Sequence, residues 1–174
     1  MGSGVYDELK AMVGQDQPGP VGSGDVCKHM IRHWCEAMED GNPLYTDEEY
    51  ARTSKYGSII APPTMIWSWV MPPLWPPREE RPEVYEKIFA ACAKGGFDQV
   101  IDTDIEMEFF RSLFPGDTVT AVTKVRDVTA EKRTHLGNGH FITLESTYRN
   151  QEAELVCAQI VTLFIYRAGG GDEA

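Results

Sequence analysis

Long apolar runs, cysteine pairs and an excess of basic residues are all missing from this sequence. No apolar stretch approaches the roughly 18 residues that a membrane-spanning helix needs, and the N-terminus has neither the basic nor the apolar segment of a signal peptide. The four cysteines form no CxxC pair, so no disulfide framework is indicated and reduced thiols are expected. We therefore expect a cytoplasmic protein.

Basic residues are outnumbered, with 16 Lys and Arg against 27 Asp and Glu and a net charge of −11. Because nucleic-acid binding relies on clustered Lys and Arg, nucleic acid is not expected as the main partner. A phosphorylated small ligand stays compatible with this charge, because it needs only a few local basic groups. With 174 residues, 42% of them apolar, the chain has the composition of one globular domain.

Histidine is also scarce, and none of the four lies in a pattern typical of a metal or nucleophile site. His29 and His33 share one face of a predicted helix, but no zinc-protease glutamate separates them, so a solvated helix face is expected. His135 and His140 bracket an "LGNG" turn and are expected at the surface. No metal site is predicted.

Helical patterns fill the first half of the sequence. Apolar spacing, caps and breakers predict helices at residues 6–13, 26–39, 46–57, 64–71 and 83–94, and Gly41 and Gly95 lie just beyond the ends of two of them. The second helix should follow a Ser23 or Asp25 cap, and the third a Thr46 cap. The face that the second helix should bury comprises Val26, Met30, Ile31, Trp34, Ala37 and Met38. Residues 14–24, "GQDQPGPVGSG", are predicted to form a loop.

Strand patterns occupy the second half, at residues 99–110, 118–129, 139–150 and 153–167. In the first of them apolar side chains alternate with acidic ones, which predicts one solvated face. The "PGD" and "RNQE" segments predict turns between strands. Helices followed by about four antiparallel strands predict an α+β domain with helices on one face of a sheet, and the Trp-rich segment before the strands is the candidate for the buried helix.

The segment "DGNPLY" (Asp40–Tyr45) has two interpretations that the residues alone leave open. As ordinary local structure, Gly41 ends a helix, Asn42 and Pro43 make a turn, and Asp40 solvates it. As a site, an aspartate and an asparagine lie close to a tyrosine that occupies the place where a histidine would complete a proton-transfer pair.

Three segments, "DGNPLYTDEEYARTSKYGSIIAPPTM", "FFRSLFPGDTVTAVTKV" and "TLESTYRNQEAELVCAQIVTLF", resemble the MaoC-like hydratase family, in particular its fatty-acid-synthase-like dehydratase N-terminal domain. The resemblance covers roughly residues 21–166. It implies the hot dog fold, an antiparallel sheet wrapped around a central helix, for one domain at residues 1–168 with a short N-terminal helix and loop, followed by a Gly-rich tail at 169–174. Family members hydrate 2-enoyl thioesters of coenzyme A or acyl carrier protein, or run the reverse dehydration, so the resemblance implies no cofactor beyond a coenzyme A thioester as substrate.

The sequence departs from this family at two catalytic positions. The family motif Asp-x-Asn-Pro-x-His pairs aspartate and histidine for general acid–base catalysis, whereas Tyr45 replaces the histidine here, and a phenol with a pKa of about 10 is a poor base at neutral pH. The family's Ala-His-Gly turn supplies a glycine N–H to the thioester carbonyl, but the turn reads Ala61-Pro62-Pro63, and proline has no N–H. No residue is therefore expected to be catalytic, and Asp40, Asn42 and Tyr45 form a degenerate motif.

The proline-rich turn and the start of the following helix are expected to bind substrate, since the family's central helix lines the acyl tunnel. The residues concerned are Ile60, Ala61, Pro62, Pro63, Thr64 and Trp67. For Trp67, a place in a pocket and plain core packing both stay open, because aromatic stripes are usually core.

The helix "CKHMIRHWCEAMEDGNPLY" and the proline-rich turn most resemble the MaoC-like domain in the larger subunit of heteromeric steroid side-chain enoyl-CoA hydratases. This implies a subunit of a heteromeric enoyl-CoA hydratase whose partner, a second MaoC-like subunit, supplies an intact Asp/His pair. Two alternatives stay open: a stand-alone hot dog hydratase or thioesterase, and a non-enzymatic acyl-thioester binding or scaffold module.

Overall fold

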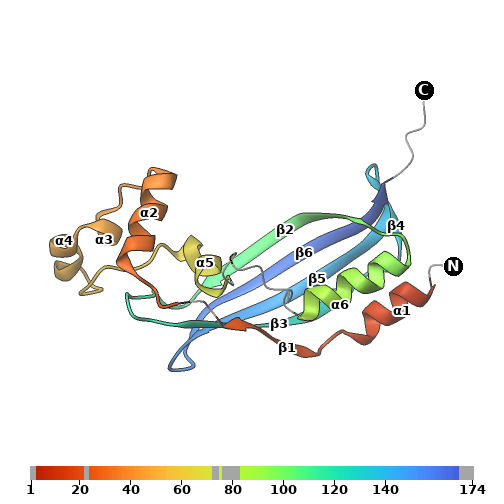
Figure 1. The fold of residues 1–174 in the computed structure, drawn as a ribbon, viewed down its shortest axis with the longest axis horizontal. Helices are drawn as coiled ribbons and strands as arrows, with labels where there is room; N and C mark the ends of the chain where they lie inside the picture. Colours follow the sequence, from red (N-terminus) through yellow and green to blue (C-terminus); the bar gives the residue numbers. More distant parts are fainter. Residues whose placement is uncertain (1–2, 22–23, 72–74, 76–82, 169–174) are drawn as a thin grey trace.

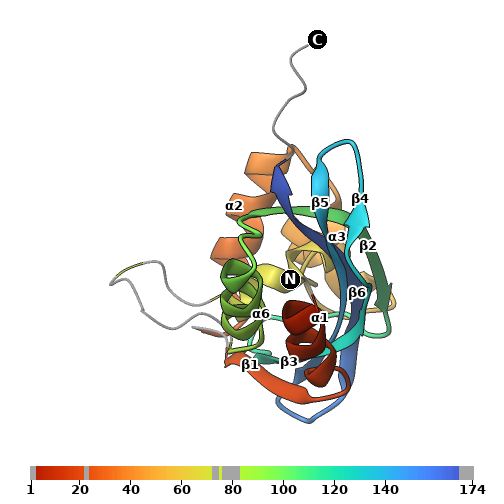
Figure 2. The same cartoon turned by 90° about the vertical axis from the view of Figure 1, so that its right-hand side faces the viewer.

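An antiparallel sheet forms the centre of the computed structural model, which describes residues 3–21, 24–71, 75 and 83–168. The strand order is β1-β3-β5-β6-β2, and β4 pairs with β5. The strands are β1 (Asp16–Val21), β2 (Gln99–Phe109), β3 (Val119–Val128), β4 (Lys132–Arg133), β5 (Gly137–Asn150) and β6 (Leu155–Ala168). The sheet is long and curved, and the helices lie along its concave face and at one end (Figures 1 and 2).

The helices divide into two groups along the sheet (Figure 1). Their bounds are α1 (Ser3–Ala11), α2 (Lys28–Met38), α3 (Pro43–Thr46), α4 (Glu48–Thr53), a 3₁₀ turn η1 (Pro63–Met65), α5 (Ile66–Val70) and α6 (Glu83–Lys94). The helices α1 and α6 cover one half of the concave face, where Leu9 and Ile88 are fully buried. The short helix α5 covers the other half with Ile66 and Trp69, while α2, α3 and α4 extend beyond that end of the sheet.

The predicted α+β class, with helices on one face of an antiparallel sheet, is confirmed. The expectation of a buried Trp-rich helix is correct for Ile66 and Trp69. However, α6 also buries apolar side chains further along the same face, because Ile88, Ala91 and Cys92 recur on one side of it and are fully buried. The concave face is therefore filled by two helices in succession. The predicted tail at residues 169–174 lies outside the described residues.

The expected loop at residues 14–24 contains a strand instead. Residues of β1 pair with β3 at the edge of the sheet, with Asp16 opposite Lys124 and a register shift between Pro18 and Val21. An edge strand tolerates proline because one side of its backbone needs no partner. Gly19 permits the close approach, since a Cβ there would lie 2.8 Å from the Ala121 carbonyl oxygen. The glycines and prolines of this segment therefore reflect an edge strand and not a loop.

Several predicted helix details were wrong. The N-cap of α2 is Cys27, without a side-chain hydrogen bond, so Asp25 is not the cap, and Ser23 lies outside the described residues. The helix ends at Met38, and Glu39 adopts the left-handed conformation with φ 53°. For α4 the cap is Asp47 and not Thr46, because the Asp47 carboxylate accepts from two backbone N–H groups of the first turn.

The buried face of α2 was also assigned too broadly. Ile31 and Cys35 are buried, but Met30 and Met38 are 43% and 62% exposed. These two methionines lie on a helix that extends beyond the sheet, so only the side facing the core loses contact with solvent. The predicted helical period is correct, but the buried face of α2 is narrower than predicted.

Strand β2 differs from its expected half-buried pattern. All but one of its residues are exposed, and Ile101, Ile105 and Phe109 are 37%, 44% and 39% exposed although they were expected on the dry face. The physical reason is that β2 is an edge strand with only β6 beside it among the described strands, and the described helices pack mainly on the other strands. Its apolar side chains therefore remain available for another surface.

His140 contradicts the expectation of a surface position. It is fully buried, its Nδ1 lies 2.9 Å from the Thr129 carbonyl oxygen, and its ring packs edge-on against Phe97. The cause is strand alternation, because His140 occupies an inward position of β5 opposite Ile165. His29, His33 and His135 are exposed, as expected.

All four cysteines are free thiols. Within the described ranges, no group of three or more His, Cys, Asp or Glu side chains is arranged to hold a metal ion. None of the helices that the structure describes is long and apolar enough to cross a membrane.

Candidate functional site

The "DGNPLY" segment forms a capped turn between α2 and α3. Asp40 Oδ1 accepts a hydrogen bond from Asn42 N at 3.0 Å, and Asn42 Oδ1 accepts from Leu44 N at 3.1 Å. Asn42 is thereby the N-cap of α3, with Pro43 in the first helical turn. Both polar side chains of the motif hydrogen-bond to the local backbone, which agrees with the predicted Asn42-Pro43 turn, but Gly41 does not end α2, because the C-cap is Glu39.

Tyr45 is half-buried and packs against the core that surrounds α5. Burial raises the pKa of its hydroxyl above the ordinary value of 10, the negative charge of Asp40 raises it further, and a hydrogen bond with Asn42 opposes both effects. The hydroxyl is therefore protonated at neutral pH, where it can donate a hydrogen bond but cannot act as the general base that a histidine would be.

The Ala61-Pro62-Pro63 turn offers no backbone donor to a ligand. The only N–H among these three residues belongs to Ala61, and it donates to the Leu113 carbonyl oxygen at 2.8 Å. Ile60 and Ala61 are buried, whereas Pro63 and Thr64 are exposed. A role of these residues in substrate binding stays a prediction.

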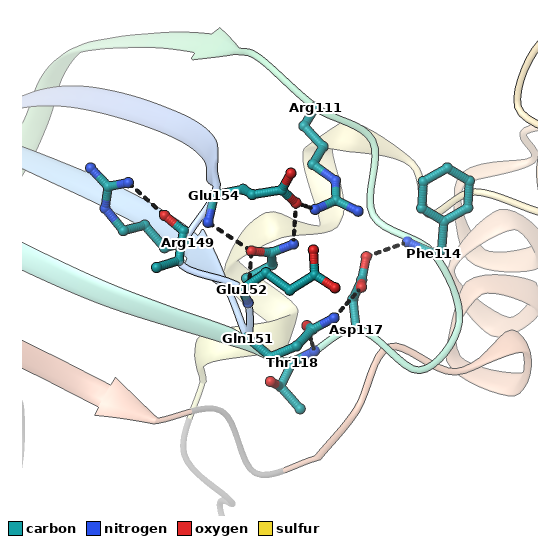
Figure 3. Close-up of polar contacts among 10 residues, drawn as sticks. Arg111, Phe114, Asp117, Thr118, Arg149, Gln151, Glu152 and Glu154 are labelled. Atoms are coloured by element: carbon teal, nitrogen blue, oxygen red, sulfur yellow. Dashed lines mark hydrogen bonds and ion pairs between the residues drawn. The ribbon is translucent and has the colours of Figure 1, made fainter.

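A polar cluster around Asp117 holds the motif end of the molecule in place (Figure 3). The Asp117 carboxylate, which is 6% exposed, accepts from Phe114 N at 2.8 Å and from Gln151 Nε2 at 2.9 Å. The Asp117 carbonyl oxygen accepts from Val26 N at 2.8 Å, just before α2. Asp117 thus joins the turn before β3, the β5–β6 hairpin and the segment that leads into α2, the helix that precedes the motif.

The same hairpin is closed by a second set of polar contacts (Figure 3). Asn150 Oδ1 accepts from Glu152 N at 3.1 Å and from Glu154 N at 2.8 Å. Glu154 forms an ion pair with Arg111, from the segment after β2. Together with the bond from Ala61 to Leu113, these contacts tie the segment at residues 110–117 to both ends of the motif region.

A separate cavity of about 380 Å³ lies between the concave face of the sheet and the helices α5 and α6. Its lining combines apolar and polar side chains: Trp67, Val70, Met71, Tyr85, Asp102, Ala121, Thr123, Ser146, Tyr148, Gln159, Val161 and Leu163. Of the six residues predicted to bind substrate, Trp67 alone lines it. Trp67 is 42% exposed, and its role in substrate binding stays a prediction.

Polar side chains cross the floor of this cavity in register. Thr123 on β3 lies opposite Ser146 on β5, and Ser146 lies opposite Gln159 on β6. The Thr123 and Ser146 hydroxyl oxygens are 2.8 Å apart. Gln159 Oε1 accepts from Trp67 Nε1 at 2.9 Å and from the Tyr148 hydroxyl at 2.5 Å. Burial raises the pKa of Tyr148 well above its ordinary range, so this hydroxyl keeps its proton.

Sequence reasoning missed Thr123, Ser146, Tyr148 and Gln159, although a signal was present. Each occupies an inward position of a strand whose other inward residues are mainly apolar, and each is buried. A polar residue at such a position marks a buried network or a ligand.

A second hollow of about 330 Å³ adjoins the motif. Its lining is Lys28, His29, Arg32, Tyr45, Thr46, Glu48 and Ile59. Lys28 is paired with Glu48 at 2.7 Å. The two hollows share no lining residue, so the motif and the polar cavity floor belong to different surfaces of the described structure.

Comparison with known proteins agrees with this geometry. A model of the FAS1-like dehydratase domain region matches residues 11–159. The chain belongs to this MaoC-like family. A chain in the crystal structure of the ChsH1-ChsH2 complex from Mycobacterium tuberculosis matches with a TM-score of 0.85 and 28% identity, covering 96% of each chain. The (R)-hydratase from A. caviae, 18% identical with a TM-score of 0.59 over 88% of this chain and 96% of that one, shares the fold. The hot dog fold is confirmed.

Curated relatives of this MaoC-like chain include named hydratase subunits. A probable enoyl-CoA hydratase alpha subunit from Thermomonospora curvata is 40% identical over 169 residues, 95% of this chain and 53% of that protein. The 3-oxo-4,17-pregnadiene-20-carboxyl-CoA hydratase alpha subunit of Mycobacterium tuberculosis is 33% identical over 144 residues, 80% of this chain and 46% of that protein. The chain spans about half the length of these relatives.

Proposed function

We propose that this chain is the non-catalytic MaoC-like part of a heteromeric enoyl-CoA hydratase. One observation carries the proposal: the fold and a cavity are present, but neither catalytic group is. Tyr45 stands in the histidine position with a pKa raised away from neutrality, and the only N–H of the Ala61-Pro62-Pro63 turn is already donated to Leu113. The names of the relatives, both alpha subunits of hydratases, support the heteromeric part of the proposal.

The partner in this proposal is a second MaoC-like subunit with an intact Asp/His pair. Its Asp and His activate a water whose hydroxyl adds to the β-carbon of a 2-enoyl thioester while a proton is delivered to the α-carbon. No cofactor takes part. This chain contributes cavity walls that bind the acyl group and exclude water, and an interface that positions the partner.

Strand β2 is the surface best suited to that interface. It is an edge strand with unpaired backbone groups on one side and with exposed Ile101, Ile105 and Phe109. A long edge strand with exposed apolar side chains is a liability in a monomer, and pairing with another hot dog unit removes it. We expect the isolated chain to self-associate or to need its partner.

The proposed substrate is a 2-enoyl-CoA with a bulky, largely apolar acyl group, of which a steroid side-chain thioester is an example. The steroid hydratase relative supports this class. A cavity of about 380 Å³, lined by Trp67, Val70 and other apolar residues, suits part of such a group.

Reconstitution tests the proposal. The chain is purified alone and together with a small MaoC-like protein that carries an intact Asp-x-Asn-Pro-x-His motif and is encoded beside it, and loss of the enoyl-thioester absorbance is followed. We expect no hydration by the chain alone and turnover by the complex. Hydration by the chain alone would establish a stand-alone hydratase, release of free coenzyme A a thioesterase, and ligand binding without turnover in the complex a binding module.

A further inference from the structure

The floor of the cavity contains a hydrogen-bond donor that the protein itself does not use. Gln159 is 5% exposed, and its Oε1 accepts two hydrogen bonds, from Trp67 and from Tyr148. Indole Nε1 is only ever a donor, so the atom that faces Trp67 must be the amide oxygen. The amide orientation is thereby fixed, and Nε2 with its two N–H groups points away from Trp67.

Among the described residues, no acceptor is hydrogen-bonded to Gln159 Nε2, although the side chain is nine-tenths buried and lines the cavity. Nε2 is not among the buried polar atoms that lack a partner, so it is reached from the cavity, where a ligand oxygen can accept from it in place of water. The Thr123 and Ser146 hydroxyls, which share this floor, bond to each other at 2.8 Å.

The chemistry of the missing acceptor follows from the surroundings. Val70, Val161 and Leu163 line the same cavity, so the body of the ligand has to be apolar. A carbonyl oxygen on that body accepts from the amide N–H and adds no charge to a buried space. A plain hydrocarbon would leave the amide unpaired.

We propose that Gln159 is a specificity-determining residue, which donates from its amide to a ketone oxygen carried on the apolar body of the acyl group, away from the thioester. Trp67 and Tyr148 are positioning residues that hold the amide in that orientation. The inference deepens the proposed function, because it takes the ligand to be an acyl-CoA, and it selects within that class for thioesters with an oxo group on a bulky acyl body.

The test is equilibrium binding to the reconstituted complex of this chain with its partner. The probes are two steroid-carboxyl CoA thioesters with saturated side chains, which cannot be hydrated, one with a ring ketone and one without it. We expect the ketone to bind at least about tenfold more tightly to the unmodified complex. In Gln159→Leu the ratio should fall to about one through loss of ketone affinity, while the other probe keeps its affinity.

Two further variants serve as a control and as a second test. Gln15→Leu removes an exposed glutamine between α1 and β1, away from both β2 and the cavity lining, and it should leave the binding ratio unchanged. Trp67→Phe removes the N–H that fixes the amide orientation, so the ketone preference should fall by about threefold or more. This variant provides the test if Gln159→Leu does not fold. Equal binding of the two probes to the unmodified complex overturns the inference, and so does a ketone preference that survives both Gln159→Leu and Trp67→Phe.

The outcome also separates this inference from the proposed function. A complex that hydrates enoyl-CoA substrates but binds both probes equally retains the function and rejects the role of Gln159. A complex without hydratase activity that still prefers the ketone through Gln159 rejects the function and retains the binding site.

Discussion

At the motif end, the side-chain oxygens of Asp40 and Asn42 accept from backbone N–H groups, whereas in the cavity the Gln159 oxygen is paired with Trp67 and Tyr148 but its Nε2 has no acceptor among the described residues. The first arrangement bonds only to the chain itself, and the second leaves a donor open to the cavity. A degenerate catalytic motif can survive as a capped turn because capping gives it a structural role. The cavity floor also has internal hydrogen bonds, but it leaves one donor free for a ligand. Under the proposed function, the ligand therefore binds in the cavity and not at the motif.

The largest expected effect separates the two subunits. In the reconstituted complex, changing the partner's motif aspartate to alanine should lower the turnover rate by about a thousandfold or more, since a positioned acid–base group contributes about 100- to 10,000-fold. Asp40→Ala should change the rate by less than about tenfold, roughly 1.4 kcal/mol. Steady-state kinetics with melting curves as the folding control check this. A thousandfold loss with Asp40→Ala at unchanged stability would show that the motif still works.

Next in size is the contribution of the polar cluster that supports the motif end. Asp117→Ala should lower the free energy of unfolding by about 3 kcal/mol, because it leaves the Phe114 N–H and the Gln151 amide without their buried acceptor. Denaturant unfolding measures the loss. The matched control is Asp127→Ala, which removes an exposed, solvent-screened ion pair with Lys10 and should leave the free energy of unfolding nearly unchanged. Similar losses for the two variants would contradict a bracing role for Asp117.

A smaller effect concerns alkaline pH. Burial raises the pKa of Tyr148, so the folded protein keeps this proton after the unfolded chain has lost its own, at a pH of about 10. The contribution of the protonated Tyr148 hydroxyl to the free energy of unfolding is complete below that pH and is lost as the pH rises above it. Melting temperatures measured on both sides of pH 10 should therefore fall less for Tyr148→Phe than for the unmodified chain.

Tyr45→Phe is the comparison at the motif end. The pKa of Tyr45 is raised in the same direction, first by burial, but the side chain is only half-buried. Its substitution should therefore change the pH slope less than Tyr148→Phe does. The reverse order would mean that the motif, and not the cavity, is the drier environment.

The smallest expected effect is the return of the histidine. Tyr45→His should leave the isolated chain without hydratase activity above background, because the Ala61-Pro62-Pro63 turn still offers no N–H to the thioester carbonyl. A sensitive enoyl-CoA hydration assay is the measurement. A clear rise in hydratase activity with Tyr45→His alone would show that catalysis does not need an N–H from this turn. It would also show that the loss of the histidine alone had inactivated the site.

Much of the fold followed from local patterns. The order of helices and strands, the end of α6 before Gly95 and the β5–β6 hairpin were all predictable from period and turn residues. The errors have a common cause, which is position in the sheet. The strand β1 was missed, and β2 was assigned a buried face, because edge strands tolerate prolines and solvent in ways that local composition does not reveal. His140 was misplaced because a single inward residue next to a turn has little pattern around it.

The sequence by itself determined the family, the two departures from its catalytic motif, and the faces of the strands on which Thr123, Ser146 and Gln159 lie. Those faces follow from the two-residue period of an extended backbone, which is a local property. Only the tertiary structure decided that these residues meet. Trp67 and Gln159 are 92 positions apart, and they touch because the β5–β6 register and the packing of α5 on the sheet bring them together. Register and helix packing depend on apolar burial summed over the whole core, so no short segment encodes the contact.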